Sequence, residues 1–386
     1  MINRELIRIK IVQLTYAYYQ NGNNNIDTAE KELLFSLTKA YDLYNYLLEL
    51  IVAVTREERH RNEILTQRAQ REGQEAPSQK FIYNKFALQL EENKMLNEFI
   101  EDKHISWNDD IEFIRKLCNQ IEQSQIYKDY IESGEGDYEE DRELWRKLYK
   151  LFIEDNDDLS ALLEEKSLYW NDDKDVVDTF VLKTIKRFDP KNKGKQELLP
   201  EYNDIEDKEF ARKLFRATIL NADTYQRYMS EISRNWELSR VAFMDLIIMQ
   251  IAIAELVNFP SIPVSVTINE YVELAKVYST PRSGGFINGM LDAIARFLNS
   301  EGVINKPMEE PQQQMHEQQK PVKRVRFVHR PRVNQEETSD DDSNTTTPTQ
   351  QEDNDVTSEE TSTNTSAPSD KQEIISEDQN NQSDAE

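Results

Sequence analysis

The chain has 386 residues, with 73 acidic residues against 47 lysines and arginines, and its net charge is −26. The length allows two or three domains of about 150 residues each. Such a charge disfavours binding to nucleic acid unless positive potential gathers locally. The single Cys118 excludes an internal disulfide and a cysteine-based zinc site.

No stretch of the sequence is long enough and apolar enough to span a bilayer. The longest apolar run, residues 246–254, is interrupted by Gln250 and flanked by Asp245 and Glu255, whereas a spanning helix needs about 20 apolar residues. We therefore expect a buried core helix there. Because no signal-peptide pattern opens the chain, we also expect a soluble, cytoplasmic protein without a membrane partner.

The sequence predicts an all-α protein, since only 9 residues are glycine and good helix formers are plentiful. A first helix carries an apolar stripe and ends in the Asn-rich turn 21–25. Residues 33–64 are predicted to form one long helix, and 67–79, containing Pro77, a loop. Helical patterns then recur at 81–104, 107–131, 139–153, 158–170 and 175–188.

Two helices are predicted near the end of the globular part. Thr267 and Glu270 have the spacing of a capping box at the start of the first. The second follows Pro281, and Gly289 inside it suggests a close approach between helices. After Gly302 the residues are mostly polar, so the segment cannot bury enough apolar surface to offset the loss of conformational entropy on ordering. This composition predicts disorder over residues 303–386.

Two motifs in these helices are specific. Residues 268–276, Ile-Asn-Glu-Tyr-Val-Glu-Leu-Ala-Lys, precede 286–292, Phe-Ile-Asn-Gly-Met-Leu-Asp. Their order and separation resemble the C-terminal signature of the NusB family of transcription antitermination factors. The resemblance extends to the family's opening helix, the helix before its central one and its central buried helix, at residues 4–16, 210–223 and 235–256.

The resemblance implies a NusB-like core of two small helical bundles. The N-terminal helical subdomain is predicted at residues 1–64 and the C-terminal NusB-like subdomain at 205–302. Residues 65–204 exceed what such a core needs, and they are interpreted as a helical insertion. The disordered tail 303–386 contains a basic segment, 321–332, with five lysines and arginines. That segment is either a nucleic-acid arm, a strand that pairs with a partner, or a solvated tail.

By the same resemblance, the protein is expected to be a noncatalytic RNA-binding antitermination factor. It would bind the boxA element of ribosomal RNA leader transcripts together with the small-subunit ribosomal protein that also serves as NusE. This complex would then join the RNA polymerase elongation complex. A protein–protein interaction module that keeps the fold without specific RNA binding is the alternative. The related domain of ribosomal RNA methyltransferases is disfavoured because no Gly-rich segment of Rossmann type follows.

The resemblance also implies a set of RNA contacts. Arg4 and Arg8 are i,i+4 neighbours whose guanidiniums would share one face, although solvated surface charges explain them too. The family's run of neighbouring arginines is thinned here by Glu5 and Leu6. Two aromatic candidates, each with a core role as the alternative, are expected to stack on bases. The predicted RNA-binding residues are Arg4, Arg8, Lys10, Gln13, Tyr16, Phe286 and Asn288.

No motif predicts an active site. The sequence has no phosphate-binding Gly-rich loop, and its four histidines lack metal-ligand spacing, so we expect no enzyme, metal or cofactor. Cys118 lies among apolar residues at helical spacing, which favours a packed thiol. Adjacent carboxylates such as Asp172 and Asp173 point to different faces of a helix and are predicted to be solvated.

Overall fold

The computed structural model describes residues 1–22, 25–170, 172–202, 204–233 and 240–307. Within these ranges the regular structure is helical and no strand occurs, which confirms the all-α prediction. An isolated parallel bridge joins Ile2 to Tyr202. The basic segment 321–332 and the rest of the chain after residue 307 lie outside the described residues.

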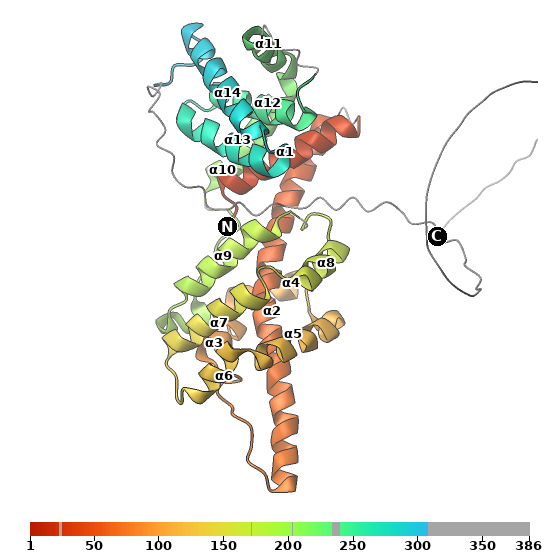
Figure 1. The fold of residues 1–386 in the computed structure, drawn as a ribbon, viewed down its shortest axis with the longest axis vertical. Coiled ribbons are helices and arrows are strands. Elements are labelled where there is room, and N and C mark those ends of the chain that lie inside the picture. The colour runs from red at the N-terminus through yellow and green to blue at the C-terminus, as the bar shows by residue number, and fades with distance from the viewer. Residues whose placement is uncertain (23–24, 171, 203, 234–239, 308–386) are drawn as a thin grey trace, which may run out of the picture. The chain divides into compact units, whose positions relative to one another are not determined.

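Helix α2 (Ile26–Glu72) contacts helices of residues 85–187 as well as the helices at residues 4–20 and 205–220 (Figure 1). It packs against α1 (Arg4–Gln20) and α10 (Ile205–Leu220). It also packs against α3 (Lys85–Glu91), α4 (Lys94–Lys103), α5 (Ile111–Gln123) and α9 (Lys174–Arg187). The helix predicted at 33–64 is confirmed but longer. It starts where the Asn25 side chain accepts from the Asp27 and Thr28 amides, and it ends at Gly73, whose φ is 65°.

The region predicted as an insertion consists of short helices. Its 81–104 pattern is not one helix, because the buried Asn93 caps a new helix by accepting from the Leu96 amide. Its 107–131 pattern likewise divides at Ser124, whose hydroxyl accepts from the Tyr127 amide. The helices are α3 (Lys85–Glu91), α4 (Lys94–Lys103), η1 (Asn108–Asp110), α5 (Ile111–Gln123), α6 (Gln125–Glu132), α7 (Tyr138–Phe152), α8 (Asp157–Lys166), α9 (Lys174–Arg187) and η2 (Pro190–Lys195).

The remaining helices pack with α1 around the apolar helix α12. The predicted buried run lies in α12, where residues 247–256 are all buried. Helix α1 contacts α10 and α12, and α13 packs between α12 and α14. These helices are α11 (Ala222–Ile232), α12 (Phe243–Asn258), α13 (Val264–Tyr278) and α14 (Ser283–Ser300).

Two local predictions about α13 and α14 are wrong. Helix α13 starts at Val264, so Thr267 lies in its first turn and does not cap it. The Thr267 hydroxyl instead donates to Glu255 of α12, at 2.9 Å. A Cβ placed on Gly289 would meet no atom within 4 Å, and the close approach is at Gly284, where a Cβ would lie 3.2 Å from Lys276 Cγ.

The described chain continues past α14 as an ordered segment. The Ile304 amide donates to the Leu298 carbonyl, and the Ile304 and Lys306 side chains are buried. Disorder was predicted from residue 303, and residues 303–307 contradict that boundary. A buried isoleucine outweighs the polar composition around it because its transfer from water is worth about 1.5–3 kcal/mol.

We therefore predict that two truncations differ in stability. Ending the chain after Pro307 should leave the thermal midpoint unchanged, whereas ending it after Ser300 should cost about 2 kcal/mol by exposing the surface that Ile304 covers. Thermal unfolding followed by circular dichroism measures both. Ile304→Ala in the full chain is the matched control and should reproduce most of the loss. Equal midpoints for the two truncations would show that this segment contributes nothing.

Candidate functional site

A buried ion pair joins the N-terminal helix α1 to the buried helix α12. Arg8 Nε and Nη2 donate to the two carboxylate oxygens of Glu255, at 2.8 and 3.0 Å. The two side chains are 5% and 0% exposed. A two-pronged contact of this kind is the strongest geometry available to an arginine and a carboxylate. The opening helix is therefore held by its own arginine.

Hydrogen bonds from α13 complete the environment of Glu255. Thr267 and the Tyr271 hydroxyl both donate to its carboxylate, and Arg8 Nη1 reaches Glu270 at 3.0 Å. Burial raises the pKa of Tyr271 well above its usual value, with the negative charge of Glu255 adding to the effect. Burial alone would lower the pKa of Arg8, but the hydrogen bond and charge of Glu255 raise it. Arg8 thus stays charged in the interior.

Lys10 is also occupied inside the protein. Its ammonium lies 2.6 Å from Asp173 Oδ1 and donates to the Tyr169 carbonyl at 3.2 Å. The Lys10 and Asp173 side chains are 3% and 0% exposed. Burial raises the pKa of Asp173 to about 6, although Lys10 acts to lower it. Asp173 belongs to the segment between α8 and α9, so the predicted insertion contacts the opening helix directly.

Gln13 faces the same segment one turn further along α1. Its side-chain amide donates to Asp172 Oδ2 at 3.0 Å and to the Tyr278 hydroxyl at 3.3 Å. Burial raises the pKa of Asp172. The prediction that Asp172 and Asp173 are solvated is wrong, because each carboxylate meets a polar side chain of α1. Their partners are some 160 residues away in the sequence, which a local pattern does not reveal.

These contacts do not fit the expectation that Arg8 and Lys10 offer their charges to RNA phosphates. Both side chains are almost completely buried and ion-paired. Arg4 differs, since its side chain is 41% exposed, pairs with Asp207 at 3.4 Å and lies over the Phe210 ring. Among the three predicted basic contacts, Arg4 is the one that solvent reaches.

The far end of α1 carries exposed aromatic residues. Tyr16 is 39% exposed, and its ring centroid lies 5.9 Å from that of Phe243, the first residue of α12, which is 44% exposed. The start of α14 is tied to the start of α12 because Ser283 donates to Asp245 at 2.8 Å. We call the surface formed by Gln13, Tyr16, Phe243 and the first turns of α14 the junction surface.

The two predicted RNA contacts in α14 lie just after Ser283 in the sequence. Phe286 is partly buried and packs against the core, whereas Asn288 is exposed. Sequence reasoning missed two neighbours, Phe243 and the exposed Arg282 that precedes α14. A signal for Phe243 was its position just before Asp245 and the apolar run 246–254, where the predicted buried helix begins.

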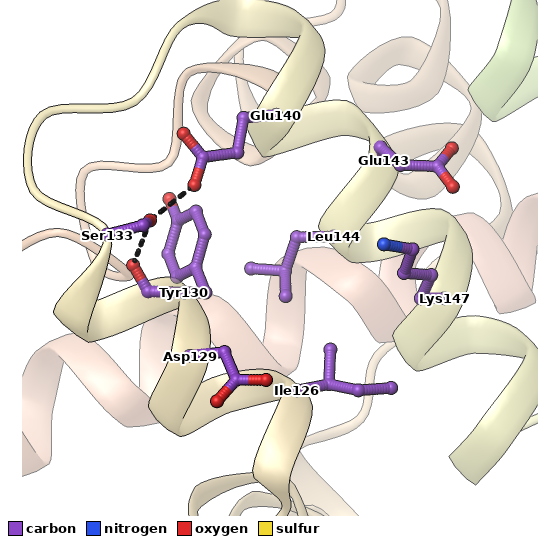
Figure 2. A pocket seen from close by; sticks show the side chains of 8 residues that line it. All are labelled: Ile126, Asp129, Tyr130, Ser133, Glu140, Glu143, Leu144 and Lys147. Atoms are coloured by element: carbon purple, nitrogen blue, oxygen red, sulfur yellow. Dashed lines mark hydrogen bonds between the residues drawn. The ribbon is translucent and has the colours of Figure 1, made fainter.

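A separate pocket of about 320 Å³ lies between α6 and α7 (Figure 2). Its Ser133 hydroxyl donates to the Tyr130 carbonyl at 3.0 Å, and that hydroxyl and Glu140 Oε1 are 2.6 Å apart. The lining contains neither histidine nor cysteine, so Ser133 has no imidazole neighbour there to activate it. The lining residues are Ile126, Asp129, Tyr130, Ser133, Glu140, Glu143, Leu144 and Lys147.

The thiol of Cys118 lies in the core. Cys118 is buried beside the Val54 carbonyl, as predicted, and burial raises the pKa of its thiol. Across the described ranges, no group of three or more histidine, cysteine, aspartate or glutamate side chains is arranged to hold a metal ion. Nor does any described helix have the length and apolarity that crossing a membrane requires.

Comparison with known proteins identifies one family of transcription factors. Residues 179–296 match the NusB family model. The transcription antitermination protein NusB of Salinibacter ruber is 38% identical over 108 residues, which are 28% of this chain and 68% of that protein. NusB of Geotalea daltonii is 37% identical over 135 residues, 34% of this chain and 89% of that protein. The chain belongs to the NusB family.

A solved structure, T. maritima NusB, is 34% identical over 30% of this chain and 82% of its own, with a TM-score of 0.24. The family match starts at residue 179, within α9. We therefore propose that family-like structure resumes before residue 205, where the sequence places the C-terminal subdomain.

The ion pair of α1 yields a prediction about stability. Arg8→Ala should destabilise the protein by about 3–5 kcal/mol, because Glu255 is left as an uncompensated buried charge. Arg4→Ala is the matched control on the same helix, and its exposed pair should be worth about 1 kcal/mol or less. Denaturant unfolding of both variants measures the difference. Equal losses would mean that Arg8 is not the anchor of α1.

Proposed function

We propose that this protein is a noncatalytic, RNA-binding transcription antitermination factor. Its relatives are named transcription antitermination proteins. The observation that carries the proposal is the junction surface, where Tyr16 and Phe243 expose aromatic rings and Ser283 at the start of α14 donates to Asp245 of α12. Sequence-specific RNA recognition commonly targets unpaired bases that stack on aromatic side chains.

Two arginines that solvent reaches are candidates for phosphate contacts. Arg282 directly precedes α14, four residues before Phe286, and Arg4 lies at the other end of α1. Phosphate contacts position an RNA without reading its bases. We propose that Arg4 and Arg282 contact phosphates while Tyr16, Phe286 and Asn288 contact bases. Arg8, by contrast, is proposed to shape the surface from within.

The RNA that we propose is the boxA element in the leader of ribosomal RNA transcripts. The small-subunit ribosomal protein NusE would bind with it, and the complex would join the elongating RNA polymerase in the cytoplasm. The family resemblance of residues 268–276 and 286–292 supports this choice of RNA and partners. Within this proposal residues 65–178 form an insertion that the family core does not require.

A protein–protein interaction module is the second candidate. The burial of Arg8 and Lys10 favours it, because two of the cations expected to meet RNA are neutralised inside the protein. The pocket between α6 and α7, with its apolar floor of Ile126 and Leu144, would then be part of the binding surface. RNA affinity separates the two candidates, since only the first requires specific binding to boxA.

We predict that the arginines and Tyr16 contribute to RNA binding in different ways. Arg4→Ala and Arg282→Ala should each weaken boxA binding and lower the salt slope by about 1, because one fewer phosphate is neutralised. Tyr16→Ala should cost about 1–3 kcal/mol with the slope unchanged, and Tyr16→Phe should retain affinity because stacking needs only the ring. Fluorescence anisotropy at several salt concentrations measures both quantities.

Arg68→Ala is the matched control for these variants. Arg68 lies near the C-terminal end of α2, and its side chain is 71% exposed. Its replacement therefore changes the net charge without altering the junction surface. Should Arg68→Ala weaken binding as much as Arg4→Ala and Arg282→Ala, the contact is general electrostatics. A wild-type chain that binds boxA no better than an unrelated RNA would reject the proposed function.

A further inference from the structure

The segment between α8 and α9 places anionic and carbonyl oxygens against the polar side chains of α1. We call its described residues, 167–170 and 172–173, the α8–α9 loop. Asp173 and the Tyr169 carbonyl meet the Lys10 ammonium, and Asp172 meets the Gln13 amide. The contact involves two successive polar positions of α1, so the loop matches this helix at more than one point.

Carboxylate oxygens are the acceptors that most resemble RNA phosphates. A lysine ammonium and a glutamine amide donate to phosphate oxygens in the same way as they donate to carboxylates. With the loop in place the Lys10 side chain is 3% exposed, so no phosphate reaches its ammonium. RNA and the α8–α9 loop therefore cannot occupy Lys10 at the same time.

The loop is fastened to α2 by aromatic residues and not by its carboxylates. The Trp170 indole donates to the Lys39 carbonyl at 2.8 Å and stacks on Tyr46, with ring centroids 5.5 Å apart. The Tyr169 ring meets Phe35 edge-on at 5.3 Å. The carboxylates can thus be neutralised while the anchor on α2 remains. A segment that is anchored on α2 and presents hydrogen-bond acceptors to α1 can compete with RNA for the donors of α1.

We propose that the α8–α9 loop of the insertion competes with RNA for Lys10 and Gln13 of α1, and so holds the protein in a state of reduced RNA affinity. The proposal rests on the proposed function, because it assumes that RNA approaches α1. It gives the insertion a regulatory role. RNA binding with full affinity requires that Asp172 and Asp173 leave α1.

The test compares the boxA affinities of three chains. Asp172→Asn/Asp173→Asn removes the competing charges. Glu164→Gln/Glu165→Gln removes the same number of charges from exposed positions of α8, and it measures the general effect of a less negative insertion. The loop variant should bind boxA about tenfold tighter than this control. Its salt slope should be steeper by about 1, because Lys10 gains a phosphate.

Adding Lys10→Met to the loop variant should remove the gain, since Lys10 supplies it. Equal affinities of the loop variant and the control, with a wild-type chain that binds boxA, would overturn the competitor and leave the proposed function standing. Weaker binding by the loop variant would mean that the loop belongs to the RNA-binding surface, which also overturns it. No binding by any of the three chains would reject both proposals.

A second measurement needs no variant, and so does not depend on how Asp173→Asn folds. The amides of Trp170 and Asp173 donate to the carbonyls of Ser167 and Trp170, which protects them from hydrogen exchange. Adding boxA RNA to the wild-type chain should accelerate exchange at the Asp173 amide as the carboxylates leave α1, whereas the Trp170 amide, in the part of the loop anchored on α2, should exchange as before. Unchanged or slower exchange at Asp173 under saturating RNA would overturn the proposal.

Discussion

The buried contact between Arg8 and Glu255 is the interaction on which the arrangement of the helices depends. Two charges in the interior are tolerated because each is matched by the other and by hydrogen bonds from Thr267 and Tyr271. The contact brings α1 to α12 and α13 although the residues are about 250 positions apart. The N-terminus is fixed by a second long-range contact, since the Ile2 amide donates to the Glu201 carbonyl at 2.7 Å. The opening helix is therefore part of the core.

The same physical rule explains how the predicted insertion meets α1. Lys10 lies between buried isoleucines and needs an anion, which Asp173 supplies from the segment between α8 and α9. Three cations predicted to serve RNA thus have internal partners, two of them deeply buried. Among the predicted RNA contacts on α1, solvent reaches Arg4 at the start of the helix and the Tyr16 ring near its end. Such a surface is better suited to RNA recognition by base stacking and a few phosphate contacts than to binding through a continuous basic groove.

The sequence was sufficient for the helical class, for the long helix α2 and for the buried run in α12, because these depend on periodicity and local composition. It was not sufficient where one side chain had two possible partners. Thr267 has the spacing of a cap, yet its hydroxyl serves Glu255, so a tertiary contact displaced a local one. Asp172 and Asp173 resemble a solvated pair until Lys10 and Gln13 are placed beside them. A signal for that burial was present, since Arg8 and Lys10 alternate with Ile7, Ile9 and Ile11 in a helix covered on most sides.

The central claim is that RNA meets this protein at the junction surface, with the buried charges of α1 supporting that surface from inside. Photo-crosslinking of a boxA RNA carrying 4-thiouridine, followed by mass spectrometry of the joined peptides, tests it most directly. The account predicts crosslinks to the peptides that contain Tyr16, Phe243 and Phe286. Crosslinks confined to helices α3–α8, with none at these three positions, would contradict it.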